Sequence, residues 1–365
     1  MSGVALFSEK KRNMKTPLIG MTLEELQNVA AHGGMPKFVG KQLADWLYVK
    51  RVGAFDEMVN ISKKNRAWLE ENYSIGVYAP ESRSKSADGT VKYLFRTSGG
   101  NVVESVYIPD HDRATLCVSS QAGCKMNCYF CATGKIGFKA NLTAAQIMNQ
   151  ILNIPPASAQ GAAPMQPLTN IVFMGMGEPL DNYKEVRKVI EILTAPWGMS
   201  WSPKRITVST VGKLPELRDL CEQTQVHVAL SLHTPDPEER ASMMPAQKAF
   251  PLKDVLQILK GYDFSHQRRL SVEYIMWRGI NDDMDHARSL VRTLEGLDCR
   301  VNLIRYHAIP DIDMQPCSEE RMIMFRNFLN SKGITATIRA SRGEDIMAAC
   351  GMLAGKGSRH KAQSR

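Results

Sequence analysis

The sequence has no long apolar segment. No run of hydrophobic residues approaches the ~18–20 positions that a membrane-spanning helix needs. The first twelve residues, Met-Ser-Gly-Val-Ala-Leu-Phe-Ser-Glu-Lys-Lys-Arg, lack the apolar core and the cleavage site of a signal peptide. These absences argue against a membrane or secreted protein, and we expect a cytoplasmic one.

Cysteine is also scarce, with eight in 365 residues. So few cysteines, in a long chain without a secretory signal, do not suggest a disulfide framework. Cys221, Cys299 and Cys317 belong to no motif, and we interpret them as ordinary thiols in a reducing compartment. The ligand pairs of a zinc finger are missing too, because no second Cys-x2-Cys or His-x3-His pair follows within reach.

What the chain does have is one dense cysteine cluster. Four cysteines lie within fifteen residues, and the last three have the spacing Cys-x3-Cys-x2-Cys: Cys117, Cys124, Cys128 and Cys131. Iron–sulfur clusters are held by cysteine thiolates, usually four of them. Three ligands would leave one iron of a four-iron cluster open for chemistry, as an open position distinguishes catalytic from structural zinc. Spacing and ligand softness favour such a cluster over zinc.

The charge balance is basic, with a formal net charge of +9 and a pI of about 9.1. Basic patches attract polyanions such as nucleic acid, although a solvated basic surface explains the charge alone equally well. The two ends of the chain are the most basic parts, and such tails often contact phosphates. The residues concerned are Lys10, Lys11, Arg12, Lys15, Lys356, Arg359, His360, Lys361 and Arg365.

The first part of the chain has helical patterns. Thr22 followed by Glu25 predicts a capping box, and the next apolar residues keep helical spacing. Further helices are expected at 41–50 and 62–73. We predict four segments: a basic tail (1–16), a helical accessory domain (17–75), a barrel with preceding strands (76–345) and a C-terminal segment that carries Cys350 and a basic tail (346–365).

Strands and helices alternate in the rest of the chain. Residues 76–115 alternate in strand fashion, and six apolar runs follow with helical stretches between them. Such a pattern implies a parallel sheet covered on both faces, and six units fit a partial (β/α) barrel. The tract at 155–164, rich in Pro and Ala, predicts a flexible insertion. Strands are expected at 116–119, 171–174, 206–209, 226–231, 270–276 and 301–305, and helices at 143–152, 183–193, 252–259, 285–294 and 319–329.

Polar motifs follow the ends of these strands, where parallel α/β folds bind ligands. Each motif alone is weak, because a Gly-x-Gly-Glu turn is more often a plain turn and a lone histidine more often a core residue. Their joint placement around one rim is the informative feature. In chain order they are the cysteine cluster, Gly175-Met-Gly-Glu-Pro-Leu, Ser209-Thr-Val-Gly, Ser231-Leu-His and His307.

The run Cys-Lys-Met-Asn-Cys-Tyr-Phe-Cys-Ala-Thr-Gly at 124–134 resembles the radical S-adenosylmethionine (SAM) enzymes. With Cys117, the strand-end motifs and Ala-Ala-Cys-Gly-Met-Leu-Ala-Gly at 348–355, it resembles the RlmN family. Met-Thr-Leu-Glu-Glu-Leu and Lys-Gln-Leu-Ala-Asp-Trp-Leu-Tyr fit that family's N-terminal domain, so the resemblance covers roughly residues 17–355.

The resemblance implies a partial (β/α)6 radical-SAM barrel and an enzyme that methylates carbon 2 of an adenine in 23S rRNA and in certain tRNAs. It implies one [4Fe–4S] cluster per chain and two SAM molecules per turnover. The first SAM methylates a cysteine, and the second is cleaved to a radical that takes hydrogen from that methyl group. An electron donor such as a flavodoxin or ferredoxin and a monomeric chain are also expected.

The resemblance also implies a role for individual residues. Cys350 would carry the methyl group, Cys117 would resolve the covalent intermediate and leave a disulfide, and Glu104 would accept a proton. The family often has Trp-Asn-Pro after the last strand, where this chain has Tyr306-His307-Ala308; His307 can still make one hydrogen bond. Cluster ligands would be Cys124, Cys128 and Cys131, and nucleotide-site residues would be Gly177, Glu178, Ser209, Ser231, Leu232 and His233.

Two other readings stay open. A Cfr-type enzyme would methylate carbon 8 of the same adenine, although Gly-Met-Gly-Glu-Pro-Leu and the N-terminal patterns favour the RlmN type. A non-enzymatic iron–sulfur or zinc RNA-binding protein would have no use for Cys350. Arg339, Arg342 and Lys356, near Cys350 in sequence, are candidates for RNA phosphate contacts.

Overall fold

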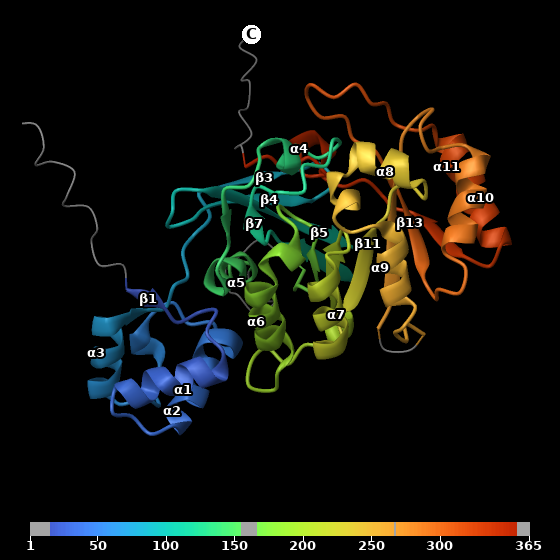
Figure 1. The fold of residues 1–365 in the computed structure, drawn as a ribbon. Helices are drawn as coiled ribbons and strands as arrows, with labels where there is room; N and C mark the ends of the chain where they lie inside the picture. The colour runs from blue at the N-terminus through green and yellow to red at the C-terminus, as the bar shows by residue number, and fades with distance from the viewer. Residues whose placement is uncertain (1–14, 155–165, 266–267, 356–365) are drawn as a thin grey trace, which may run out of the picture.

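The structure, a computed structural model, describes residues 15–154, 166–265 and 268–355. Its described part is built around a ten-stranded sheet in which seven parallel strands continue into three antiparallel ones (Figure 1). The strand order is β14-β13-β12-β11-β10-β9-β6-β5-β4-β3, so each parallel strand lies beside its neighbour in sequence. The predicted tract at 155–164 and the two basic tails, apart from Lys15, lie outside the described residues.

The six predicted parallel strands are confirmed. Their central residues are almost entirely apolar and buried, because helices cover the sheet. A seventh parallel strand, β14 (Thr335–Ile338), adds to them at the edge. The six are β6 (Arg113–Cys117), β9 (Asn170–Phe173), β10 (Ile206–Thr210), β11 (His227–Ser231), β12 (Leu270–Met276) and β13 (Arg300–Arg305).

A helix follows each of the six strands and packs on the outer face. On α6, Val186, Val189, Ile190 and Leu193 recur at helical spacing and are all buried. The expected helices are confirmed, and the structure adds α7 and a short helix, α8 (Pro237–Met243). The helices of the barrel are α5 (Ala144–Leu152), α6 (Tyr183–Thr194), α7 (Leu214–Gln223), α9 (Leu252–Leu259), α10 (Met284–Thr293) and α11 (Glu319–Ser331).

Three antiparallel strands extend the sheet beyond β6. They are β3 (Ser82–Lys85), β4 (Val91–Arg96) and β5 (Val102–Asp110). The described C-terminal residues, up to Gly355, pass close to β3 and β4 (Figure 1). The extension therefore lies beside the last residues of the described chain, far away in sequence.

The N-terminal unit contains three α-helices, α1 (Leu23–His32), α2 (Phe38–Ala44) and α3 (Lys63–Asn72), and the short parallel pair β1 (Thr16–Pro17) and β2 (Tyr73–Ser74). The capping box of Thr22 and Glu25 is confirmed. The second helix begins earlier than expected and ends in a π-helical turn, Asp45–Val49.

The N-terminal unit contacts α5, α6 and the segment after α6. A Cβ on Gly20 would lie 2.2 Å from the amide nitrogen of Ala145, so only glycine fits there. Lys188 of α6 pairs with Glu25, and the rings of Tyr48 and Trp197 lie 6.1 Å apart. In the described chain, no helix has the length and apolar character needed to cross a membrane.

Candidate functional site

The cysteine loop, residues 118–138, leaves the carboxyl end of β6. Two features fix its path. A Cβ on Gly123 would lie 1.8 Å from the carbonyl oxygen of Gly137, so the two ends of the loop touch only because residue 123 has no side chain. Phe130 is buried against the rings of His233 and Trp277, with centroids 5.1 and 4.9 Å away. The loop is therefore packed onto the barrel.

Cys124 is buried, Cys128 and Cys131 are half-buried, and the three thiols lie close enough to act on one another electrostatically. Burial raises the pKa of Cys124 to about 12, and the charges of Glu178 and Cys131 act in the same direction. Burial also raises the pKa of Cys128, with contributions from Cys131 and Cys124. Within the described residues, no three His, Cys, Asp or Glu side chains lie at the spacing of ligands around a single metal ion. Three soft thiols facing one space are the donor set that an iron–sulfur cluster needs.

Glu178 lies beside this loop, in the turn after β9. Its backbone amide donates to the Gln121 side chain at 2.9 Å, and a Cβ on Gly177 would lie 2.5 Å from Gln121 Cβ. The carboxylate accepts from the amides of Leu180 and Val211, each at 3.1 Å. Burial raises its pKa to about 7. The Gly-x-Gly-Glu turn thus joins the loop to the end of β10.

Ser209 and Ser231 lie on neighbouring strands with their hydroxyls 3.4 Å apart. Behind them is Arg240 of α8, which is fully buried. Its guanidinium donates to the carbonyls of Ser231, Leu232 and Val211 and to the Gln247 side chain. Arg240 also lowers the pKa of Cys128 against the larger effect of burial. It therefore ties the ends of β10 and β11 together and places positive charge near the thiols.

His233 is held in one orientation. Its φ of 63° lies in the left-handed region, which is uncommon for a residue with a side chain. Nδ1 accepts from the Ile275 amide at 3.1 Å, so the ring proton belongs on Nε2. Burial and the charge of Arg240 lower its pKa to about 3, which keeps the ring neutral. A neutral ring with a fixed tautomer offers one N–H as a donor.

Cys117 and Cys350 are brought together although 233 positions separate them in sequence. Cys117 is the last residue of β6. Burial is the main cause that raises the pKa of its thiol, and the nearby Cys350 raises it further. Burial raises the pKa of the Cys350 thiol as well, followed by the charge of Glu273, and Cys131 acts in the same direction. The Cys350 residue nevertheless has an exposed surface, and all eight cysteines are free thiols. Cys350 thus lies between the end of β6 and the cysteine loop.

Residues 339–355, here called the C-terminal strap, carry Cys350. The loop side of the strap is held by two hydrogen bonds: the Ala132 amide donates to the Gly351 carbonyl at 2.8 Å, and the Thr133 hydroxyl to the Leu353 carbonyl at 2.6 Å. On its other side, Glu104 accepts from the amides of Ala354 and Gly355. The strap therefore crosses between the cysteine loop and β5.

His307 contacts the C-terminal strap. It is buried, and its Nδ1 is 3.5 Å from a carboxylate oxygen of Glu344 in the strap. The interactions described for Ser209, Ser231 and His233 do not include it. The structure thus connects His307 to the strap rather than to the serine pair.

Sequence reasoning missed several site residues. Glu273 is buried in β12, where it accepts from the Ser271 hydroxyl and the Asn302 amide at 2.8 Å. A single charge inside an otherwise apolar parallel strand was the available signal, because such strands are covered on both faces. Arg240 and Gln121 gave no comparable signal. A buried ion pair between Lys92 of β4 and Glu104 was missed as well.

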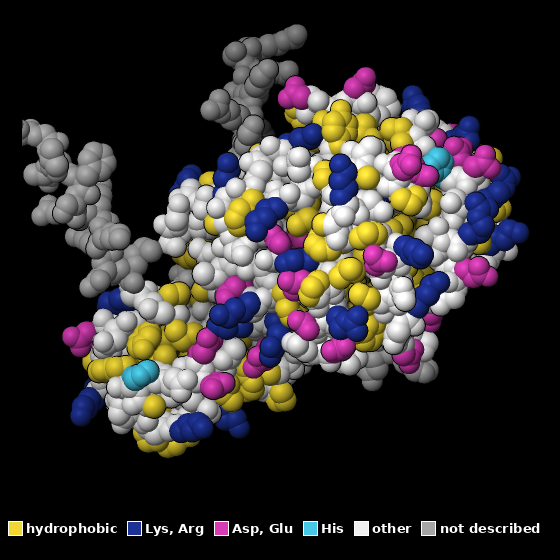
Figure 2. Space-filling view, in the orientation of Figure 1, with side chains coloured by type: hydrophobic (Ala, Val, Ile, Leu, Met, Phe, Trp, Pro, Cys, Tyr) yellow, Lys and Arg dark blue, Asp and Glu magenta, His cyan; other side chains and the backbone are white. Residues whose placement is uncertain are grey.

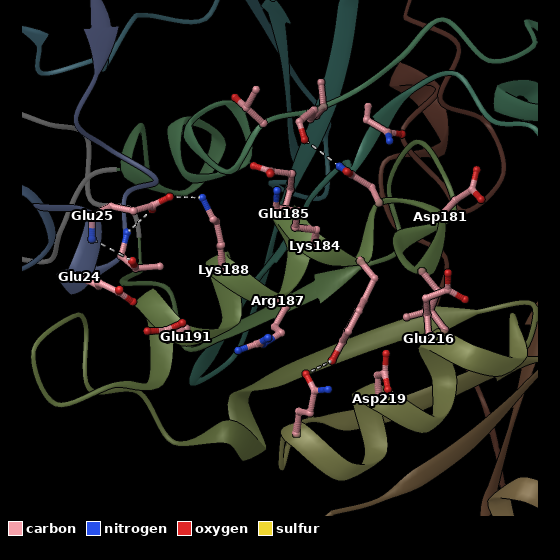
Figure 3. A pocket seen from close by; sticks show the side chains of 18 residues that line it. Glu24, Glu25, Asp181, Lys184, Glu185, Arg187, Lys188, Glu191, Glu216 and Asp219 are labelled. Atoms are coloured by element: carbon pink, nitrogen blue, oxygen red, sulfur yellow. Dashed lines mark hydrogen bonds and ion pairs between the residues drawn. The ribbon is translucent and has the colours of Figure 1, made fainter. Parts of the chain in front are cut away.

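A wide hollow of the described surface lies elsewhere, between α1, α6 and α7 (Figure 3). Its volume is about 940 Å³, and it is open and strongly charged. Seven carboxylates line it against three cations, Lys184, Arg187 and Lys188. This acidic lining is unsuited to phosphate, so we place the functional site at the cysteines. On the face shown in Figure 2, basic and acidic side chains are interspersed.

Comparisons with known proteins identify two parts of the chain. The chain matches the Radical SAM superfamily over residues 118–291, which begin with the cysteine loop. It also matches the ribosomal RNA large subunit methyltransferase N-terminal domain over residues 16–75. The two matches fall on the barrel and on the N-terminal helical unit.

Individual relatives are similar over nearly their whole length. A probable dual-specificity RNA methyltransferase RlmN of Parabacteroides distasonis is 57% identical, over 93% of this chain and 96% of the relative. A dual-specificity RNA methyltransferase RlmN of Geotalea uraniireducens is 42% identical, over 94% and 97%. The crystal structure of a radical SAM methyltransferase from Sphaerobacter thermophilus has a TM-score of 0.87 and 38% identity, and covers 93% of this chain and 100% of that one.

Proposed function

Because this chain belongs to the RlmN family of radical SAM methyltransferases, we propose that it methylates carbon 2 of an adenine in 23S rRNA and in certain tRNAs. The observation that carries the proposal is the meeting of Cys350, Cys117 and the cysteine loop. Carbon 2 has no lone pair with which to attack a methyl donor. A carrier cysteine, a second cysteine that releases it and a radical source are what such a reaction needs in one place.

Membership of the radical SAM family implies a [4Fe–4S] cluster and the use of SAM. Cys124, Cys128 and Cys131 would hold one cluster, since Cys131 lies close enough to Cys124 and Cys128 to raise the pKa of both thiols. When bound, the cluster supplies the electron that cleaves SAM to a radical. We propose two SAM molecules per turnover, one for the methyl group on Cys350 and one for the radical.

The nucleotide would lie over the carboxyl ends of β9, β10 and β11. Glu178 has lone pairs left to accept from an ammonium group, and the serine hydroxyls of Ser209 and Ser231 can bond to a ribose. Gly177 and Leu232 offer backbone atoms, and His233 offers its Nε2 proton. A contact from His307 would require it to act from the strap side of the site.

Release of the RNA is assigned to Cys117. Once the methyl carbon joins Cys350 to the base, the Cys117 thiolate attacks the Cys350 sulfur. A sulfur–sulfur bond forms, the bond between the Cys350 sulfur and the methyl carbon breaks, and that carbon keeps the electron pair and takes a proton. Glu104 is the proposed acceptor of the proton lost from the base. Both of its carboxylate oxygens already have partners, so this role requires one partner to be displaced.

The RNA must present an unstacked base to the rim, as in other base-modifying enzymes. Arg339 and Arg342 of the strap are proposed phosphate contacts, and Arg342 at present pairs with Asp110 at 3.3 Å. We further propose that the enzyme is a monomer served by a flavodoxin or ferredoxin.

Anaerobic reconstitution with iron, sulfide, SAM and an RNA substrate tests the function. Mass spectrometry of digested RNA should show 2-methyladenosine, and the small-molecule fraction should show 5′-deoxyadenosine. If 8-methyladenosine is the product, the enzyme is of the Cfr type. If a loaded enzyme yields neither modified base, the proposal is wrong.

A further inference from the structure

A buried lysine lies under the bend that carries Cys350. Lys92 of β4 is only 5% exposed, yet its ammonium nitrogen lies 3.2 Å from the Met347 carbonyl oxygen, to which it donates. The same nitrogen lies 3.2 Å from Oε1 of Glu104, an ion pair without the geometry of a hydrogen bond. A buried charge is tolerated only when it is paired. Of the two partners of Lys92, Met347 belongs to the strap and Glu104 is hydrogen-bonded to it.

Glu104 carries the connection to the other side of Cys350. Its second oxygen, Oε2, accepts from the amides of Ala354 at 3.0 Å and Gly355 at 3.1 Å. Lys92 and Glu104 are diagonal neighbours on one face of the β4–β5 pair, because Lys92 lies opposite Val106. The pair thus reaches residue 347 on one side of Cys350 and residues 354 and 355 on the other.

Between these two anchors, Cys350 itself is reached by neither member of the pair, although the Gly351 carbonyl beside it accepts from the Ala132 amide of the cysteine loop. The residue is exposed, and the next one, Gly351, has a φ of +82° with nothing closer to a built Cβ than 3.5 Å. The two flanks therefore define how far the sulfur can travel. A displacement of about 1 Å from a reacting geometry can lower a rate by about a hundredfold.

We propose that Lys92 is a positioning residue for Cys350, which it places by joining Met347 to Glu104 and, through Glu104, to the downstream amides. This inference rests on the proposed function, in which Cys350 must approach both the radical source and Cys117. It also assigns a role to the antiparallel extension of the sheet, since β4 supplies Lys92 and β5 supplies Glu104. Asp88, in the turn between β3 and β4, adds a third anchor by accepting from the Gly343 amide at 2.9 Å.

The test replaces Lys92 in the full-length, cluster-loaded enzyme. Lys92→Met keeps the length of the side chain and removes its charge and its hydrogen-bond donors. Lys92→Arg keeps the charge and the donors. For Lys92→Met we expect amide hydrogen exchange in residues 348–355 to become at least about tenfold faster, the size of one lost charge-assisted hydrogen bond. We expect kcat to fall at least about tenfold, with KM for RNA within about twofold, because substrate contacts remain. Lys92→Arg should restore both exchange and kcat.

Arg96→Met is the matched control. Arg96 lies on the same strand and pairs with Glu81 at 2.8 Å rather than with Glu104 or Met347, so its replacement should change neither readout. If Lys92→Met does not fold, Lys92→Gln removes the charge that pairs with Glu104 but keeps a polar side chain, and should act in the same direction.

Unchanged exchange in 348–355 after either substitution would overturn the inference, as would faster exchange with a kcat equal to that of the wild type. Hydrogen exchange needs no turnover. It therefore tests the positioning by Lys92 even in an enzyme that fails to methylate RNA, and failure of the inference is distinguishable from failure of the proposed function.

Discussion

The cysteine loop and the C-terminal strap bring their thiols to the same space, but they are held in different ways. The loop is fixed by its backbone: Gly123 touches Gly137, and the Tyr129 amide donates to the Met243 carbonyl at 2.8 Å. The strap is held mainly by side chains of other elements, above all Lys92 and Glu104. The proposed cluster ligands need fixed separations, whereas the proposed carrier cysteine must change partners, and each form of support suits the proposed task.

The largest effect that separates the two regions concerns the cluster. Replacing Cys124, Cys128 and Cys131 together by alanine should abolish the visible absorbance of the reconstituted protein, since no ligands remain. Cys350→Ala should leave that absorbance intact. Iron analysis and absorbance spectra of both variants make the check. Stoichiometric zinc without iron in anaerobically prepared wild type would contradict the assignment.

Cys117 and Cys350 should fail in different ways. Cys350→Ala removes the carrier, so neither methylated RNA nor a covalent adduct should form. Cys117→Ala keeps the carrier but lacks the thiolate that breaks the adduct. A nuclease-sensitive shift on a denaturing gel should therefore appear for Cys117→Ala alone, and the double variant should not show it. Wild-type turnover by Cys117→Ala would refute the assigned roles.

Most of the barrel was predictable because buried parallel strands have an unmistakable composition. The run Leu270–Met276 is a clear example. β14 was missed because Thr-Ala-Thr-Ile is short and half polar, as an edge strand can be. α7 had the signal, since Leu217, Leu220 and Cys221 follow helical spacing and are buried, but its first turn contains a proline.

The candidate site, like the fold, was only partly predictable from the sequence. The cysteine spacing identified the loop from residues alone, because ligands of one cluster that are close in sequence leave a local pattern. The pairing of Cys117 with Cys350 came only through the family resemblance, since a contact across 233 positions leaves no local trace. Lys92 was not predictable, because a lysine in an alternating strand normally faces solvent, and its partner Met347 is far away in sequence.

Two glycines sharpen the contrast between backbone support and side-chain support. Gly123→Ala places a Cβ 1.8 Å from a carbonyl oxygen, at a φ of +75°, and should destabilise the fold by about 3 kcal/mol or more. Gly351→Ala meets only an atom 3.5 Å away, and should cost about 1–2 kcal/mol for its left-handed φ. Urea unfolding of both variants, with cluster content as a second measurement, makes the comparison. Equal losses would mean that the loop is not held by its backbone.

The smallest effect concerns the outer support of the rim beside the loop. His286 of α10 lies 3.0 Å from Glu239, whose same oxygen accepts from the Thr234 hydroxyl next to His233. Its hydrogen bond to Glu239, with further help from Asp283, raises the pKa of His286 to about 9. A raised histidine pKa stabilises the folded state fully below the unfolded pKa of about 6.5, and this contribution is lost as the pH rises through about 9.

His286→Gln should therefore lower the free energy of unfolding by about 1 kcal/mol at pH 6, a small effect because solvent screens a partly exposed pair. At pH 9.5 the loss should be much smaller, because the wild-type imidazole is then mostly neutral. Urea midpoints of wild type and variant at the two pH values give the measurement. Hydrogen exchange of residues 348–355 should stay the same, since Lys92 and Glu104 hold the strap independently of α10. A difference between the midpoints that does not depend on pH would show that His286 acts through packing and not through its charge.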